Sequence, residues 1–155
     1  MRKSVLPSSP AEPRPSLDAW LDLEHLASLE ISSEDPAHPF EHALHGGDTE
    51  GWKATDPGPQ TIRLKFDEPR AIHRIRLEFR ESHLERSQEF ALSATAAGEK
   101  RQIVRQQWSF SPTGSTTEVE DFAVNLSGVS MIELEIDPGR HDKQAHASLQ
   151  SIAIA

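Results

Sequence analysis

Apolar side chains recur at every second position in most of this sequence, and that period constrains the fold more than any other feature. Successive residues of a β-strand point to opposite faces of a sheet, so each run predicts a strand with one buried face. Short polar turns separate the runs, and no helical pattern of the kind that a parallel sheet needs lies between them. The sequence therefore predicts an all-β fold, an antiparallel sandwich of about eight strands. The clearest runs lie at residues 29–32, 62–66, 75–79, 90–94, 104–110, 122–126, 132–136 and 149–154.

The first 16 residues differ in composition from the rest of the chain. They contain four prolines, many serines and few side chains that a core could bury, which predicts a disordered Pro/Ser-rich tail over residues 1–16. From Ser16 the leucines first follow a helical spacing and then alternate at Leu29 and Ile31. We expect a short helical turn that leads into the first strand, and one domain over residues 17–155.

Composition excludes several classes of function. A net charge of −9 argues against binding to nucleic acid or to an anionic membrane surface, because both need a basic face. The absence of cysteine excludes disulfides, thiol nucleophiles and Cys-ligated metals. No apolar run is long enough for membrane insertion, and no signal peptide is recognisable, so a cytoplasmic location is expected. Nucleophile elbows, phosphate loops and dinucleotide fingerprints are also missing, which predicts that the protein is not an enzyme.

Arginine is concentrated in the middle third of the chain. Cross-strand ion pairs with neighbouring acidic residues are the simpler explanation, and a docking face for an acidic group is the alternative. The arginines concerned are Arg63, Arg70, Arg74, Arg76, Arg80, Arg86, Arg101 and Arg105.

Residues 38–52 form the densest cluster of chemically capable side chains. If Pro39 begins a helical turn, His38, His42 and His45 share one face and could bind zinc, although solvated histidines are the simpler interpretation. Trp52 is predicted to be buried in the core, as are the other two tryptophans, Trp20 and Trp108. Exposed aromatic platforms for sugars are the alternative for each tryptophan.

The order of short motifs resembles the discoidin-like domains, or coagulation factor V/VIII type C domains, of the galactose-binding-like superfamily. It is similar in particular to small bacterial stand-alone versions. The resemblance covers residues 17–155 and implies an eight-stranded jelly-roll sandwich whose ligands bind loops at one end, here residues 33–42, 53–60 and 81–88. The matching motifs are Ser32-Ser33, residues 43–46, Trp52, residues 60–66, residues 72–77, residues 88–90 and residues 147–149.

Calcium binding is not expected, although many relatives hold a structural calcium ion. The positions that carry calcium ligands in the family correspond here to His45, Glu50 and Ser151. A site that loses carboxylates in this way should bind calcium poorly. Asp48 and Glu50 are therefore only weak calcium candidates, and we predict no cofactor and no metal.

The resemblance implies a non-catalytic binding module, chiefly for a carbohydrate (glycan). The alternative is an intracellular protein–protein interaction or scaffold domain, so the expected partner is a glycan or a protein. Side chains at the predicted loops and strand ends can form paired hydrogen bonds to a sugar, and Arg is well suited to this role. The candidate ligand-binding residues are His38, Arg80, His83 and Arg86. Arg80 and Arg86 could instead only neutralise Glu81 and Glu85.

Overall fold

The structure is a computed structural model that describes residues 20–45 and 50–155. The predicted tail at residues 1–16 and the calcium candidate Asp48 lie outside the described residues. Most of the described chain is antiparallel β-structure with few helices, as the period of two predicted. The elements in chain order are α1 (Leu23–Leu26), β1 (Ala27–Ile31), α2 (Glu41–His45), β2 (Trp52–Pro57), β3 (Gln60–Arg80), β4 (Arg86–Ala96), β5 (Glu99–Phe110), β6 (Thr117–Asp137), β7 (His146–Leu149) and β8 (Ser151–Ile154).

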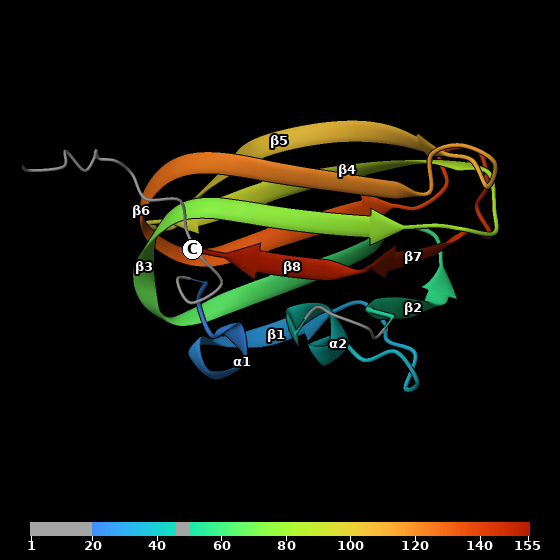
Figure 1. Ribbon diagram of the computed structural model, residues 1–155. Coiled ribbons are helices and arrows are strands. Elements are labelled where there is room, and N and C mark those ends of the chain that lie inside the picture. Colours follow the sequence, from blue (N-terminus) through green and yellow to red (C-terminus); the bar gives the residue numbers. More distant parts are fainter. Residues whose placement is uncertain (1–19, 46–49) are drawn as a thin grey trace, which may run out of the picture.

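Two long strands, β3 and β6, each run through both layers of the structure (Figure 1). The first part of β3 pairs with β1 and with the last part of β6, which in turn pairs with β4, and β4 pairs with β5. The second part of β3 pairs with β8 and with the first part of β6. Strands β2 and β7 form a separate antiparallel pair. The two layers are therefore continuous through the curved strands.

The alternating apolar residues lie in the core between the layers, as predicted. Ile62 and Leu64 on β3 are buried, and so are Ile132, Leu134 and Ile136 on β6. The rings of Phe79 on β3 and Phe90 on β4 lie with their centroids 5.3 Å apart and join the two layers. Burial of these faces removes apolar surface from water, which is the main force that holds such a sandwich together.

The separate strands predicted at residues 62–66 and 75–79 are one strand in the structure, β3, and those at 122–126 and 132–136 are both part of β6. The pairing register shifts between Lys65 and Arg74, where β3 bends from one layer into the other. Glu68 and Pro69, which follow the run at residues 62–66, lie within this bend and do not end the strand. Such irregularities bend a strand without ending it.

The expected ligand loop at residues 53–60 and the expected histidine face also differ in the structure. Residues 53–57 belong to β2, because the backbone of this segment pairs with β7. Helix α2 begins only at Glu41, so His38 precedes it and does not share a helical face with His42. Among the described residues, no group of three or more acidic or histidine side chains is placed to hold a metal ion.

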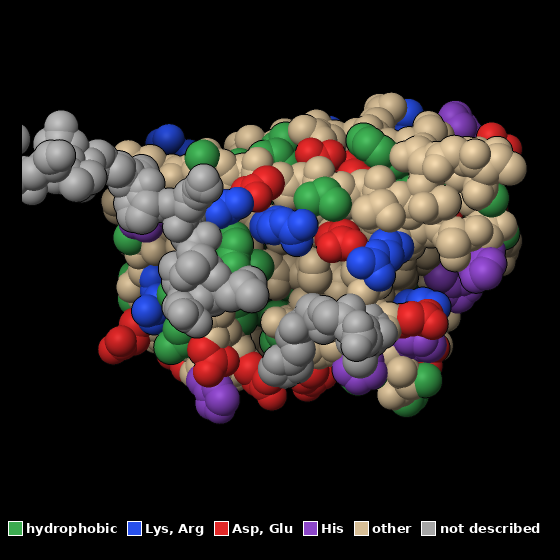
Figure 2. Space-filling view, in the orientation of Figure 1, with side chains coloured by type: hydrophobic (Ala, Val, Ile, Leu, Met, Phe, Trp, Pro, Cys, Tyr) green, Lys and Arg blue, Asp and Glu red, His purple; other side chains and the backbone are tan. Residues whose placement is uncertain are grey.

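Basic and acidic side chains lie side by side on the face of the molecule seen in Figure 2. Several arginines of the middle third form ion pairs on the outer face of β3, which favours the simpler of the two interpretations for them. Arg74 binds Asp121 with two hydrogen bonds, at 2.8 and 2.6 Å. Arg76 and Arg80 share their face of β3 with Glu78, and both pair with it. None of the helices that the structure describes has the length and apolar character needed to cross a membrane.

Candidate functional site

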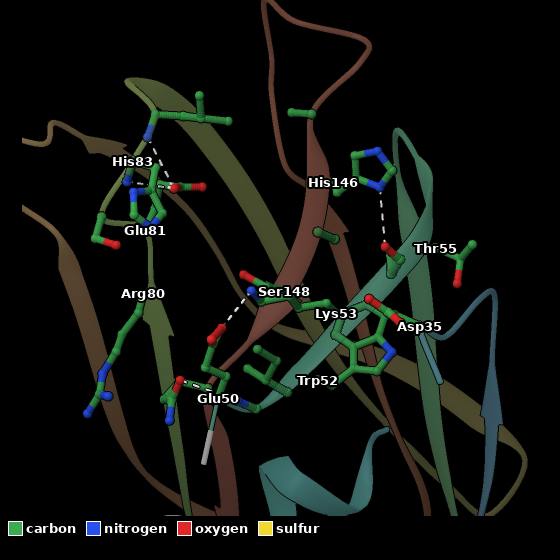
Figure 3. Close-up of a pocket in the computed structure, with 18 of the residues that line it drawn as sticks. Asp35, Glu50, Trp52, Lys53, Thr55, Arg80, Glu81, His83, His146 and Ser148 are labelled. Carbon is green, nitrogen blue, oxygen red and sulfur yellow. Dashed lines mark hydrogen bonds and ion pairs between the residues drawn. The ribbon is translucent and has the colours of Figure 1, made fainter. Parts of the chain in front are cut away.

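A pocket of about 900 Å³ opens at the end of the molecule where β2, β7 and the end of β3 meet (Figure 3). Four segments form it, and all three loops that the resemblance implied as the ligand end contribute residues. This volume lies in the range of pockets that hold small ligands. The lining segments are residues 35–36, 50–55, 80–84 and 142–150.

The turn at residues 35–38 is fixed to β2 by backbone hydrogen bonds. The Asp35 N–H donates to the carbonyl oxygen of Lys53 at 2.9 Å, and the Lys53 N–H donates to that of His38 at 3.2 Å. The indole N–H of Trp52 donates to the carbonyl oxygen of Ser33 at 3.1 Å. These bonds make the turn and the strand one wall of the pocket.

Gly51 allows β2 to approach β7 closely. A Cβ atom at this position would lie 2.1 Å from the carbonyl oxygen of Leu149 and 2.6 Å from that of Gln150. Only glycine avoids both backbone clashes. Trp52 follows it and is fully buried, with its ring against Phe40 at a centroid distance of 6.5 Å. The prediction that Trp52 lies in the core is confirmed.

Glu50 is the centre of an ion-pair cluster at the pocket wall. Its Oε2 atom accepts a hydrogen bond from Lys53 Nζ at 2.7 Å and lies 3.6 Å from His38 Nε2. The hydrogen bond from Lys53 and its positive charge lower the pKa of Glu50, with smaller contributions from the charges of His38 and His83. The other ring nitrogen of His38 lies 3.1 Å from Asp35 Oδ2. His38 therefore holds the wall together and does not itself line the pocket.

The opposite wall is the connection between β3 and β4, and Glu81 organises it. One carboxylate oxygen accepts the backbone N–H groups of His83 and Leu84, at 3.1 and 3.2 Å. The other accepts Arg86 Nε at 2.8 Å. Burial alone would raise the pKa of Glu81, but the hydrogen bonds from Arg86 and from the two backbone N–H groups lower it overall. Glu81 is therefore charged and turns the connection so that His83 and Leu84 reach the surface.

Arg86 is not an exposed loop residue, contrary to the expectation from the sequence. It is the first residue of β4, and its side chain is only 2% exposed. The guanidinium lies over the ring of Phe110, and Nη1 donates to the carbonyl oxygen of Pro138 at 2.7 Å and to Gln88 Oε1 at 3.1 Å. Arg86 therefore links the connection between β3 and β4, through Glu81, to the turn that follows β6, through Pro138.

A buried acid continues this polar network behind the pocket. Gln88 Nε2 donates to Glu118 Oε1 at 3.0 Å, and neither residue is exposed to solvent. Burial, together with a hydrogen bond to Glu120 and the charge of that residue, raises the pKa of Glu118 to about 8. Glu118 is therefore a neutral carboxylic acid at pH 7, which is what burial without a cation in contact favours.

The structure brings His83 and Arg80 to the pocket, as the sequence predicted, but their orientations differ. His83 is exposed at the pocket wall. The Arg80 side chain extends away from His83 (Figure 3), and its Nε atom binds Glu78 at 2.8 Å. Arg80 therefore forms the edge of the pocket with its cation already paired.

Sequence reasoning missed the wall formed by residues 142–148. His146 and Ser148 alternate with the buried Ala147 and Leu149 on β7, a period of two that could have revealed a strand with two outward polar residues. His146 Nδ1 lies 3.2 Å from the carbonyl oxygen of Ala54 on β2. This contact orients the ring at the pocket, opposite His83 (Figure 3).

A second, smaller groove of about 460 Å³ lies between β5 and β6. Its lining is mostly apolar and includes Ile103, Val124 and Leu126. Polar residues such as Glu99, Arg101 and Asn125 also line it, but it has about half the volume of the first pocket and is the weaker candidate.

Comparison with known proteins relates this chain to others through its fold. The sequence matches no family model and no curated protein. Among solved structures, the family 32 carbohydrate-binding module of NanJ from Clostridium perfringens, in complex with galactose, superimposes with a TM-score of 0.63 at 13% identity over 87% of this chain and 96% of that one. A family 32 module of CpGH89 from the same organism, in complex with GalNAc-β-1,3-galactose, gives a TM-score of 0.63 at 16% identity over 87% and 98%.

The family 32 module of AlyQ, in complex with 4,5-unsaturated mannuronic acid, gives a TM-score of 0.60 at 14% identity over 84% of this chain and 95% of that one. At these identities the comparison shows the fold alone. The chain has the antiparallel β-sandwich fold of these family 32 modules.

Proposed function

We propose that this protein is a non-catalytic glycan-binding module and that the glycan binds in the 900 Å³ pocket. The observation that carries the proposal is that the charged groups of the pocket are paired within the chain, while several neutral polar groups are not. Lys53, Arg80 and Glu81 are already paired within the chain. The side chains of Thr55, Ser82, His83 and Ser148 line the same pocket, and none has a hydrogen-bond partner within the part of the chain that the structure describes.

Such neutral groups fit a saccharide. A hydroxyl both donates and accepts, and an imidazole can do either, so each can bind a sugar hydroxyl without a charge to neutralise. Preformed pockets with a few convergent polar groups are typical of small-ligand sites. The sugars bound to the NanJ and CpGH89 modules support this ligand class, because those modules share the fold of this chain.

His83 and Leu84 provide the apolar contact that a pyranose ring requires. Leu84 is 53% exposed at the tip of the connection between β3 and β4, next to the exposed ring of His83. The aromatic faces that could serve instead are not open to the pocket: Trp52 is fully buried, and the ring of Trp20 lies under Arg74 at 5.1 Å. The C–H face of the sugar therefore packs on His83 and Leu84, while Ser148 binds a hydroxyl.

The narrower assignment to the discoidin-like domains is part of this proposal. It rests on the ordered motifs from Ser32 to Leu149. The expectation that the protein needs no cofactor and catalyses no reaction also belongs to the proposal, and it rests on the altered calcium-ligand positions and the missing catalytic motifs. A protein partner remains the alternative function.

The test combines a glycan array with calorimetry on matched variants. We expect the purified protein to bind at least one class of glycan on the array. Ser148→Ala should weaken that binding by about three- to tenfold, the effect of one lost hydrogen bond. Ser127→Ala is the matched control, because Ser127 lines the second groove and not the pocket. Absence of any glycan ligand, or an equal loss in both variants, would contradict the proposal.

A further inference from the structure

We infer that His83 and His146 set the charge class of glycan that the pocket binds: neutral glycans at any pH near neutrality, and acidic, carboxylate-bearing glycans more tightly when these histidines are protonated. This inference rests on the proposed function. It concerns regulation of the same pocket and is argued from the charges that line it.

Acidic side chains outnumber basic ones among the described lining residues. The carboxylates are Asp35, Glu50, Glu81 and Asp142, and the cations are Lys53 and Arg80. With neutral histidines, the pocket therefore carries a negative charge and repels a carboxylate-bearing ligand. A neutral sugar carries no net charge, so the negative charge of the pocket does not repel it.

Each cation at the pocket already has a carboxylate beside it. Lys53 Nζ is 2.7 Å from Glu50, and Arg80 Nε is 2.8 Å from Glu78. Arg86 is buried and pairs with Glu81 at 2.8 Å. The charge of each cation is therefore offset by a protein carboxylate, and none of the three leaves a net positive charge for a ligand carboxylate.

His83 and His146 are the two imidazole side chains among the described lining residues. Imidazole ordinarily gains its proton between pH 8 and 5, which no other side chain does with its usual pKa. The two rings lie on opposite sides of the pocket, with Glu50 and Lys53 between and below them (Figure 3). Protonation of both would add two positive charges to a lining where carboxylates exceed cations by two.

Charged side chains of the pocket lining surround both imidazole rings. His83 lies beside Glu81 of its own connection and across the pocket from Glu50, while the Arg80 side chain extends away from it (Figure 3).

His146 bonds to the carbonyl oxygen of Ala54, and the nearby charged groups of the lining are Asp142 on its own connection and Lys53 and Asp35 on the facing wall. His38 lies behind Glu50, between Glu50 and Asp35. Its charge is therefore balanced locally by two carboxylates.

The size of the effect follows from Coulomb's law in water. One unit charge at about 6 Å changes the affinity for a carboxylate by roughly threefold, so two histidines change it by about tenfold. The ligand carboxylate remains ionised throughout, since carboxyl groups of this kind have a pKa near 3.5. Neutral glycans should change by less than about twofold over the same range.

The experiment is a glycan array that carries neutral and uronate-containing glycans, probed at pH 7.5 and at pH 5.5. We expect the neutral ligands to be retained at both pH values and the uronate glycans to bind about tenfold more tightly at pH 5.5 than at pH 7.5. The double variant His83→Gln, His146→Gln should lose the pH-dependent gain.

His73→Gln is the control, because the His73 backbone bonds to Ala155 at the opposite end of the molecule, and it should keep the gain (Figure 1). Equal binding of uronate glycans at both pH values, no uronate binding at pH 5.5 beside a bound neutral glycan, or a gain that persists in the double variant would overturn this inference alone. Absence of binding to every glycan at both pH values would overturn the proposed function itself.

Discussion

Replacement of Glu118 by Gln should make the protein more stable at alkaline pH and nearly unchanged at acidic pH. Glu118 is fully buried and accepts one hydrogen bond from Gln88, while its second carboxyl oxygen, Oε2, accepts none and can carry the proton that bonds to Glu120. Its pKa is raised to about 8, first by burial and then by Glu120. Gln mimics the protonated acid: it accepts from Gln88 with its oxygen and donates to Glu120 with its nitrogen.

The folded and unfolded states bind different numbers of protons at Glu118, and this difference sets the direction in which stability changes with pH. Between pH 4.5 and 8 the folded protein keeps the proton on Glu118, whereas the unfolded chain loses it. Stability therefore falls as the pH rises through this window and levels off above about pH 8. The full shift corresponds to a loss of up to about 5 kcal/mol, and we expect at least about 2 kcal/mol. That is a large share of the stability of a domain of this size.

The assay is urea unfolding at pH 5, 7 and 9, followed by tryptophan fluorescence, for the wild type and for Glu118→Gln. The difference in free energy of unfolding between the two should be near zero at pH 5 and favour the variant at pH 9. Because groups other than Glu118 and its neighbour Glu120 titrate alike in both proteins, the difference isolates this pair of carboxyl groups. Glu85→Gln, at an exposed position, should show no such trend. A difference that does not change with pH would refute the buried neutral acid.

Three other perturbations have defined outcomes. Arg86→Ala should destabilise the fold by about 3–5 kcal/mol in denaturant melts, because it leaves Glu81 and Gln88 without their buried partner; an unchanged midpoint would mean that the ion pair is dispensable. Trp52→Ala should cost a similar ~3–5 kcal/mol, the usual effect of removing a large buried aromatic; a stable variant that loses only ligand binding would instead make Trp52 a platform. Calcium should leave the melting temperature unchanged, whereas saturating a real site 100-fold above its Kd would add about 2.7 kcal/mol; a rise that Asp48→Ala abolishes would show a site.

The period of two was sufficient to predict most strands and their buried faces, but it missed β2 and did not predict which strands are continuous. Ile62 and Ile75 are both inward-facing, as predicted, yet they belong to one strand. The polar stretch around Pro69 is a local signal for a break, while the strand continues because its partner β6 shifts register beside it. A partner strand that is distant in sequence cannot be identified from local pattern.

The sequence predicted which end of the sandwich carries the pocket, but not which residues the side chains around it would pair with. The resemblance indicated the end of the sandwich where the pocket lies, and His83 lines it. Arg86 was misplaced because loops were assumed to be exposed. Extending the alternation of Phe90 and Leu92 backwards by two steps would have placed Gln88 and Arg86 on the inward face. The contact of Arg86 with Pro138 joins residues 52 positions apart, and only the folded chain reveals it.

The most direct test of the central claim is to map the bound glycan on the protein by NMR. Titration of the isotope-labelled protein with a glycan selected on the array should shift the backbone amide signals of residues 53–55, 82–84 and 142–148, which line the pocket. The signals of Ile103 and Leu126, in the groove between β5 and β6, should remain in place. Shifts concentrated at that groove, or no shifts with any glycan, would contradict the account.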